Sequence, residues 1–315
     1  MTSRQVVVLA GGLSHERDVS IRSGRRLADA LREAGLDVAV RDVDAALVPT
    51  LTADRPWVVV PMLHGASGED GSLRDVLGLL GLPYVGSLPA PSRLAFDKPS
   101  AKARVAAAGL DVPGGVALPE STFRELGASV VMAALVDGLG LPLMVKPAAG
   151  GSALGASVVR DAGELPAAMV GCFAYGGTAL VEPYVSGTEI AVSVVETERG
   201  PVALPAVEVV PDGGRYDYAA RYTAGSTEFF VPARLEPVVA AAAADLAVRA
   251  HTALGLRDLS RTDLVVDAAG RCWFLEANVA PGMTETSLFP QAVAAAGQDL
   301  GRLWLGLVER AAARG

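Results

Sequence analysis

Residues 5–87 alternate between short apolar runs and segments whose apolar residues recur at helical spacing. The pattern predicts strands over 5–10, 37–43, 57–63 and 84–87, and helices over 20–34 and 71–81. Alternating strands and helices are typical of a small doubly wound parallel sheet. Ligands on such sheets bind beyond the carboxyl ends of the strands, so His15, Glu16 and His64 are expected to lie at a site.

A composition shift over residues 88–102, where prolines precede a new helix, predicts a domain boundary. The later pattern predicts helices over 98–108, 122–138 and 236–254, and strands over 143–148, 156–160, 178–185, 188–196 and 202–210. Residues 211–227 are rich in glycine and tyrosine and carry no apolar pattern. The expected division is therefore into segments 1–95, 96–185 and 186–315.

The overall composition narrows the class of protein. The chain has 315 residues, 51% of them hydrophobic, which is enough for more than one core in an ordered globular protein. A net charge of -8 argues against nucleic acid or an anionic membrane as a general partner. Two cysteines are too few for a disulfide framework, and no stretch approaches the roughly 20 apolar residues of a membrane span. We therefore expect a cytoplasmic protein.

An acidic constellation follows the last predicted helix, in the segment RTDLVVDAAGRCWFLEAN. Its alternating apolar residues predict a β-hairpin, on which Glu276 and Asn278 leave the same face because they are two residues apart. Asp263 shares that face if the hairpin loop has two residues, whereas a three-residue loop would place it opposite Leu275. We therefore expect an even-numbered loop or a compensating β-bulge.

Two carboxylates and an amide oxygen on one face suit Mg²⁺, which takes few protein ligands and completes its shell with water and phosphate. Arg261 adds a cation on the same face for a phosphate or an oxyanion. Acidic residues spaced like this also occur simply as a polar edge where a hairpin reaches solvent. The cluster alone therefore indicates only a metal and a phosphate.

A glycine-rich loop, Gly150–Gly155, follows Lys146 at the end of a predicted buried strand. Glycines let backbone N–H groups approach phosphate oxygens, and a lysine supplies point charge. The loop does not match the Walker pattern, and a glycine-rich turn between strands is often only a hairpin connection. Lys98, at the start of the next predicted helix, is a second candidate, as are Glu182 and Glu189 around PYVSG.

Together these segments resemble the D-alanine–D-alanine ligases of the ATP-grasp superfamily. Matching motifs run in order from VVVLAGGLSHERDVSIRSG and LHGASGEDGSLRDVLGLLGLPYVGS, through FDKPSAK, LMVKPAAGGSALG, VEPYVSGTEIAVSVV and YDYAARYTAG, to SRTDLVV and FLEANVAPGMTETSLFPQAVAAAG. The resemblance implies an α/β chain with a Rossmann-like N-terminal domain and two ATP-grasp subdomains of mainly antiparallel sheet. It also implies ATP-dependent ligation of two D-alanines through D-alanyl phosphate for peptidoglycan, in a homodimer.

The resemblance assigns roles at the nucleotide. Lys98, Lys146 and the Gly151–Gly155 loop would hold the phosphates, Glu182 and Val185 the adenine, and Glu189 the ribose. Asp263, Glu276 and Asn278 would bind two Mg²⁺ ions, for which Mn²⁺ can substitute. Residues 211–227 would form a lid in which Tyr218, Arg221 and Tyr222 close over the nucleotide.

The resemblance also assigns roles at the substrates. Glu16 would bind the ammonium of the first D-alanine, linked to Ser152 and Tyr222, and His64 would lie near its carboxylate. Arg261 and the Gly282 N–H would stabilise the tetrahedral oxyanion, and Ser287 and Leu288 would place the second D-alanine.

The chain departs from the family pattern at Gly150, Ala153 and Arg221, where an acidic residue, a serine and a lysine are usual. The alternative to D-alanyl-D-alanine synthesis is therefore a related ligase for a different D-amino acid. Tyr222 favours an amine over D-lactate as the second substrate.

Overall fold

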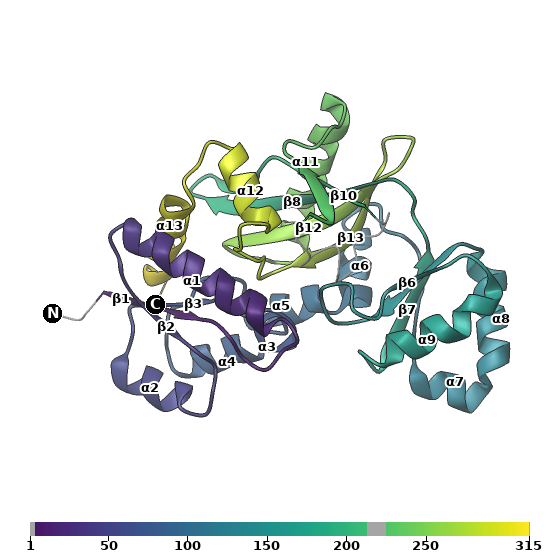
Figure 1. Cartoon of the computed structure of the whole chain (residues 1–315), viewed down its shortest axis with the longest axis horizontal. Helices are drawn as coiled ribbons and strands as arrows, with labels where there is room; N and C mark the ends of the chain where they lie inside the picture. The colour runs from purple at the N-terminus through teal and green to yellow at the C-terminus, as the bar shows by residue number, and fades with distance from the viewer. Residues whose placement is uncertain (1–3, 213–224, 315) are drawn as a thin grey trace.

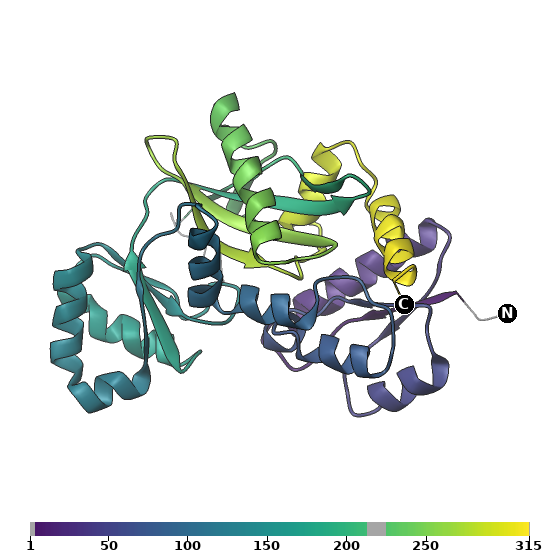
Figure 2. The ribbon, with the colours of Figure 1, turned by 180° about the vertical axis from the view of Figure 1, so that it is seen from behind.

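The computed structural model describes residues 4–212 and 225–314. Figure 1 shows three units, with the N-terminal and C-terminal units stacked on each other and a smaller central unit standing to one side. Figure 2, seen from behind, shows the same arrangement, with the helices of residues 89–107 running between the N-terminal unit and the other two. The three segments 1–95, 96–185 and 186–315 stay a prediction as domain boundaries.

The N-terminal unit contains a parallel sheet of order β2-β1-β3, as its alternating pattern predicts. Its elements are β1 (Gln5–Leu9), α1 (Arg17–Glu33), β2 (Asp37–Arg41), α2 (Leu47–Asp54), β3 (Val58–Pro61), α3 (Ala66–Glu69), α4 (Ser72–Leu79) and α5 (Pro89–Phe96). Val6 and Val8 face a core that contains α1, whereas Val7 and Leu9 face a core that contains α2 and α4. Both faces of β1 are covered, which explains its continuous apolar run.

The central unit is an antiparallel sheet of order β4-β7-β5-β6 with helices on one side. Its elements are β4 (Val116–Pro119), α7 (Glu120–Leu126), α8 (Ala128–Leu139), β5 (Leu143–Pro147), β6 (Ser157–Val159), η1 (Ala162–Glu164), α9 (Leu165–Phe173) and β7 (Thr178–Pro183). The preceding helix α6 (Lys98–Ala107) packs instead on β13 of the C-terminal unit.

The C-terminal unit is built on an antiparallel sheet of order β11-β10-β8-β12-β13, with β9 also pairing β8. Its elements are β8 (Thr188–Thr197), β9 (Gly200–Ala203), β10 (Val207–Pro211), β11 (Thr227–Phe230), α11 (Pro237–Ala253), β12 (Leu259–Val266), β13 (Cys272–Asn278), α12 (Leu288–Ala295) and α13 (Leu300–Ala312). Trp304 and Leu307 of α13 share a core with Leu27 and Leu31 of α1. The chain therefore closes by packing its last helix on the first.

Three predicted elements differ from the structure. The helix predicted over 122–138 is two helices, because Gly127 adopts φ +90°, which a continuing helix cannot use. The strand predicted over 202–210 is divided into β9 and β10 around Pro205, which has no N–H to donate to the sheet. The short strand predicted over 84–87 is a single bridge between Tyr84 and Val59.

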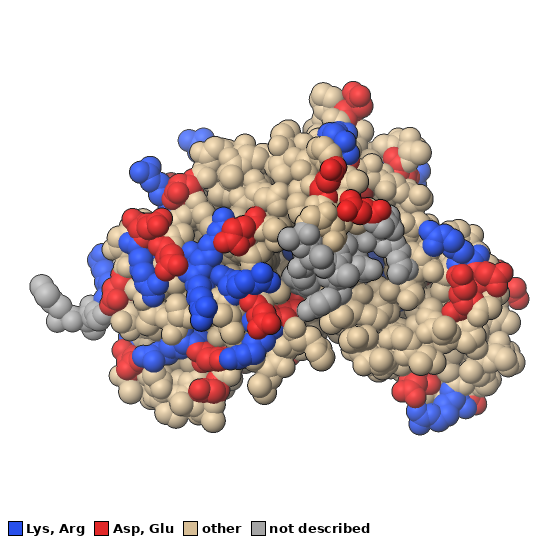
Figure 3. Space-filling model, viewed as in Figure 1, with Lys and Arg blue, Asp and Glu red and all other residues tan. Residues whose placement is uncertain are grey.

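The surface of the N-terminal unit is mixed in charge. Arg22, Arg25 and Arg26 of α1 line a shallow hollow with Asp29 and Glu33. Figure 3 shows basic and acidic side chains interspersed over this face. None of the described helices combines the length and the apolar character that a bilayer span requires.

Candidate active site

Two adjoining cavities lie where the three units meet, and they share Lys98, Gly150, Gly151, Glu276 and Leu288. The first, here called the polar cavity, is also lined by Glu16, His64, Glu69, Ser152, Arg261, Asn278, Gly282, Thr284 and Ser287. The second, here called the apolar cavity, is also lined by Met144, Lys146, Leu154, Glu189, Ile190, Val209, Asp263, Leu264 and Leu275. Residues from distant parts of the sequence therefore converge at one wall.

The β12–β13 hairpin brings the acidic residues together through a compensating bulge. Asp267 N donates to Arg271 O at 3.0 Å, which leaves a three-residue loop between them. That loop would place Asp263 opposite Leu275, but the register shifts between Asp263 and Leu264, so that Asp263 pairs with Glu276. The structure therefore confirms the second of the two expected arrangements, a bulge that restores the shared face.

Each of the two facing carboxylates lies beside a cation. Arg261 donates to both oxygens of Asp263, at 2.7 and 2.8 Å. Lys98 Nζ lies 3.2 Å from Glu276 Oε2 and donates to Gly150 O at 2.6 Å. Asp263 lines the apolar cavity, Arg261 lines the polar cavity, and Lys98 and Glu276 line both. Carboxylates and cations therefore lie side by side where the cavities adjoin, which suits a ligand that carries both phosphate and metal.

The donor set fits Mg²⁺, although within residues 4–212 and 225–314 no three His, Cys, Asp or Glu side chains form a metal cluster. Asp263 and Glu276 supply only two such groups, and the third oxygen is that of Asn278, which accepts from Ala280 N at 2.7 Å. Few protein ligands of hard oxygen character are what Mg²⁺ takes when phosphate and water complete its shell.

The glycine-rich loop adopts a conformation that is uncommon for its residues. Ser152 and Ala153 both have positive φ, 52° and 55°, between Gly150 at 119° and Gly155 at 71°. Consecutive left-handed residues cost roughly 1–2 kcal/mol each and turn backbone N–H groups toward one side. Such strain is typical of a binding loop rather than of a plain hairpin connection.

Glu16 is linked across the polar cavity to this loop, as expected. Ser152 Oγ donates a short hydrogen bond to Glu16 Oε1, and both side chains are buried. Tyr222, which the resemblance adds to this pair, lies outside the described residues, as do Tyr218 and Arg221. The link from the N-terminal unit to the phosphate loop is therefore present in the described part of the chain.

Glu182 is buried beside two lysines and, like Val185, does not appear among the described residues that line the two cavities. Lys146 Nζ lies 2.7 Å from Glu182 Oε2, and Lys102 Nζ donates to Glu182 Oε1. Burial, with the neighbouring Lys146 charge, lowers the pKa of Lys102 to about 7. The sequence reasoning missed Lys102, although it lies one helical turn after Lys98.

Glu69, which lines the polar cavity, is a second residue that the sequence reasoning missed. It lies in the quoted motif LHGASGED, and Gly65 N donates to its Oε1 at 2.9 Å. Burial, with the nearby Glu16 carboxylate, raises the pKa of Glu69 from 4.5 to about 8. A neutral carboxylic acid at this position can donate a hydrogen bond into the cavity.

The Glu69→Gln variant is expected to remove a loss of stability at neutral pH. Because the folded pKa is about 8 instead of 4.5, the native state keeps a proton that the unfolded chain releases. Stability from this group is full below about pH 4.5 and is lost as the pH rises to about 8. Without ATP or divalent metal, the melting temperature of Glu69→Gln should therefore rise relative to that of the wild type as the pH increases from about 5 to about 8. Parallel profiles would contradict the raised pKa.

Gly282 lies at the polar cavity beside the residues expected to place the second substrate. A Cβ on Gly282 would come within 2.8 Å of Ser287 Oγ, so glycine is the residue that fits. Ser287 Oγ also accepts from Thr284 N at 3.0 Å and contacts Thr284 Oγ1 at 2.8 Å. Leu288 lines both cavities, as the first residue of α12.

Comparisons with known proteins agree with this geometry. A family model described as the D-ala D-ala ligase C-terminus matches residues 105–309. The D-alanine–D-alanine ligase of Anaeromyxobacter sp. (strain K) is 40% identical over 296 residues, which cover 94% of this chain and 93% of that protein. The D-alanine–D-alanine ligase of Bordetella petrii is 40% identical over 313 residues, covering 98% and 93%.

Solved structures with related folds include the VanG D-Ala:D-Ser ligase of Enterococcus faecalis, with TM-score 0.83 and 25% identity over 98% of this chain and 99% of that one. A D-alanine–D-alanine ligase of Bacillus anthracis, complexed with ATP, has TM-score 0.79 and 26% identity over 99% and 98%. The predicted fold class, a parallel N-terminal sheet followed by two antiparallel sheets of ATP-grasp type, is thereby confirmed. The chain belongs to the D-alanine–D-alanine ligase family.

Proposed function

We propose that this protein is an ATP-dependent ligase that joins two D-alanines into D-alanyl-D-alanine, a precursor of peptidoglycan. Relatives that are about 40% identical over nearly the whole chain are named D-alanine–D-alanine ligases. The observation that carries the proposal is the wall shared by the two cavities, where Glu276 and Lys98 lie between a polar and an apolar space. A phosphoryl donor bound in the apolar cavity can there meet a small acceptor bound in the polar cavity.

The apolar cavity suits the nucleotide. Met144, Ile190 and Val209 offer apolar contact for an adenine, and Glu189 offers a carboxylate for ribose hydroxyls. Lys98 and Lys146 bring positive charge to the phosphates, which the Gly151–Gly155 loop would cover. Glu182 and Val185 stay in the proposal as adenine contacts through the strand end, with the Glu182 carboxylate held by its two lysines.

The polar cavity suits the two amino acids. Glu16, held by Ser152, offers buried carboxyl oxygens to the ammonium group of the first D-alanine. Arg261 and the Gly282 N–H line the same space and would stabilise the oxyanion. Ser287, which lies beside Gly282, and Leu288 would contact the second D-alanine.

Two steps follow from this arrangement. The carboxylate of the first D-alanine attacks the γ-phosphorus of ATP, so that ADP leaves and an acyl phosphate forms. The amine of the second D-alanine then attacks the acyl carbon, a peptide bond forms, and inorganic phosphate leaves with loss of a proton from the amine. Water would hydrolyse the acyl phosphate, so the site has to exclude it. Residues 211–227, with Tyr218, Arg221 and Tyr222, are the proposed lid.

Asp263, Glu276 and Asn278 are the proposed ligands of two Mg²⁺ ions, with Mn²⁺ able to substitute. When bound, such ions would neutralise phosphate charge and align the phosphoryl group. A homodimer, expected from the family resemblance, and a cytoplasmic location, expected from the composition, stay predictions.

Product identification tests the proposal. With ATP, Mg²⁺ and D-alanine, mass spectrometry is expected to detect D-alanyl-D-alanine, with one ADP released for each dipeptide. Parallel assays with D-serine, D-lactate and L-alanine as second substrate are expected to give less product. Failure to use D-alanine in both positions, together with ADP release on another amino acid, would favour the related ligase with a different substrate.

A further inference from the structure

The loop that carries Gly282 is held by side chains of the N-terminal unit. His64 Nδ1 lies 3.0 Å from Ala280 O, at one end of the loop. At the other end, Met283 N donates to Ser23 Oγ at 3.0 Å. His64 Nε2 lies 3.3 Å from the same Ser23 Oγ, so the two contacts join into one ring. Ser23 and His64 lie more than two hundred residues away from this loop in the sequence.

The donors and acceptors of this ring have a single consistent assignment. A carbonyl oxygen only accepts, so His64 Nδ1 carries the proton that bonds Ala280 O. Burial lowers the pKa of His64, so its imidazole is neutral and the unprotonated Nε2 is an acceptor. Ser23 O–H must then donate to Nε2, while its oxygen accepts from Met283 N–H. Both nitrogens of the His64 imidazole and the hydroxyl of Ser23 thereby have hydrogen-bond partners.

Two further contacts make α1 a rigid support for this ring. Arg26, one turn after Ser23, donates from Nη1 to Met283 O at 3.1 Å and to Thr284 O at 2.5 Å. A Cβ on Gly24 would lie 2.4 Å from Ala10 Cβ. Glycine at position 24 therefore lets α1 pack closely against the residue that follows β1. Ser23, next to Gly24 on α1, is fully buried.

We propose that Ser23 and His64 are positioning residues that clamp the 280–283 loop and so fix the Gly282 N–H where the oxyanion forms. This inference rests on the proposed ligase function. Both ring nitrogens of His64 are used by protein atoms, so His64 acts on the loop rather than as an N–H donor to the carboxylate of the first D-alanine. The N-terminal unit would thus bind the first substrate through Glu16 and also position the Gly282 N–H for the second step.

The Ser23→Ala variant is expected to lose dipeptide formation more than ADP release. Because the Gly282 N–H serves the second step, its displacement should slow amine attack by about tenfold to a hundredfold. The acyl phosphate then partitions to water, so the yield of dipeptide per ADP should fall well below one, with the KM for ATP unchanged. A variant that was only less stable would lose both products in the same proportion, and that result would overturn the clamp.

Ser20→Ala is the matched control. Ser20 is also a fully buried serine of α1, but its hydroxyl donates to Met62 O at 2.6 Å and accepts from Gly11 N at 2.8 Å, away from the 280–283 loop. This variant should lose a comparable amount of thermal stability and keep its dipeptide yield per ADP. If the wild-type enzyme itself makes no dipeptide, the proposed function fails; if it does and Ser23→Ala stays coupled, only the clamp fails.

The tautomer of His64 provides a test that does not depend on activity. The chain has 3 histidines, so a ¹⁵N-histidine spectrum of the wild-type protein is simple to assign with His64→Gln. The clamp requires a neutral ring protonated at Nδ1, and the ¹⁵N shifts are expected to show that form at neutral pH. An Nε2–H tautomer or an imidazolium would overturn the proposal, because Ser23 could then not donate to the ring.

Discussion

Replacing Glu276 by alanine is expected to abolish dipeptide formation. Glu276 lies on the wall that both cavities share, pairs with Asp263 across the hairpin and faces Lys98 at 3.2 Å. The substitution removes a carboxylate that both proposed Mg²⁺ ions would share, and it leaves Lys98 without its counter-charge. Losing several kcal/mol of stabilisation of the phosphoryl group corresponds to roughly a thousandfold or greater fall in kcat.

The measurement is dipeptide and ADP formation at saturating ATP, Mg²⁺ and D-alanine. Glu276→Gln separates charge from shape, since it keeps an oxygen at the same place, and it should lose almost as much activity as the alanine variant. Glu125→Ala, which alters an exposed glutamate of α7, is the control and should remain active. Near-normal turnover of Glu276→Gln would exclude a metal site built on this carboxylate.

The hairpin shows both the reach and the limit of sequence reasoning. Side-chain alternation predicts that Glu276 and Asn278 share a face, and the β-strand geometry of β13 agrees. The partner of Asp263 depended on loop parity, which the segment VDAAGRCW leaves open. The observed bulge at Leu275 restores the pairing, because the extra residue returns Asp263 to the face of Glu276, and both carboxylates line the apolar cavity.

Contacts between distant segments were harder to predict. Lys98, Lys146 and the glycine-rich loop were identified because their charge and conformational freedom are visible in the sequence. Ser23 was not, because its hydroxyl meets Met283 only after α1 packs against the C-terminal unit. Glu69 was missed for a similar reason: nothing local indicates that its carboxylate will be buried beside Glu16.

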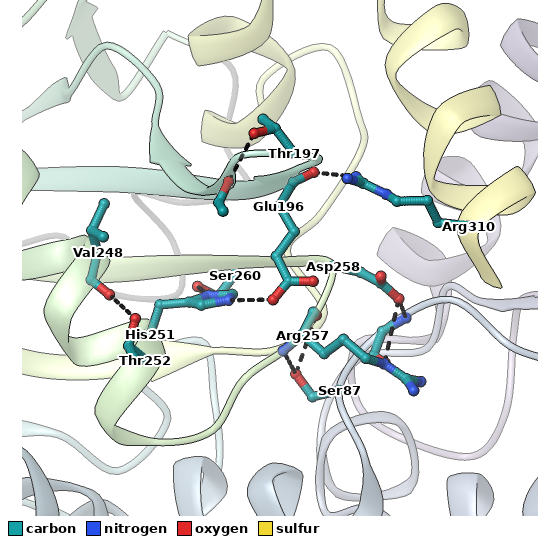
Figure 4. Close-up of polar contacts among 12 residues, drawn as sticks. Ser87, Glu196, Thr197, Val248, His251, Thr252, Arg257, Asp258, Ser260 and Arg310 are labelled. Atoms are coloured by element: carbon teal, nitrogen blue, oxygen red, sulfur yellow. Dashed lines mark hydrogen bonds and ion pairs between the residues drawn. The ribbon is translucent and has the colours of Figure 1, made fainter. Parts of the chain in front are cut away.

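A buried ionic network joins the end of the chain to the two large units, around Asp258. Its carboxylate is fully buried and accepts from Arg314 at 2.9 and 2.8 Å and from Gly86 N at 2.7 Å. Arg257 lies 3.7 Å from the same carboxylate and donates to Gly86 O at 2.9 Å. Figure 4 shows Asp258 and Arg257 beside Ser87, with Ser260 of β12, Glu196 of β8 and His251 of α11 nearby.

The Asp258→Ala variant is expected to destabilise the protein by about 2–4 kcal/mol, because it removes the buried acceptor of the Gly86 N–H and the carboxylate that pairs with the partly exposed Arg314. It also puts alanine at φ +67°, a backbone conformation that aspartate and asparagine tolerate better. The melting temperature should fall by roughly 5–10 °C.

Asp258→Asn should recover part of that loss, because asparagine keeps an acceptor for the Gly86 N–H and accepts the left-handed backbone, while the charge facing Arg314 stays absent. Asp245→Ala is the matched control for removing an aspartate from an ion pair, since Asp245 and Arg249 form an exposed contact on α11, and it should change the melting temperature little. If Asp258→Ala and Asp245→Ala have the same melting temperature, the network contributes nothing to holding the units together. If the order is wild type, then asparagine, then alanine, the charge and the backbone acceptor each contribute. Asp258 then holds both Arg314, which follows α13, and the Gly86 N–H of the N-terminal unit.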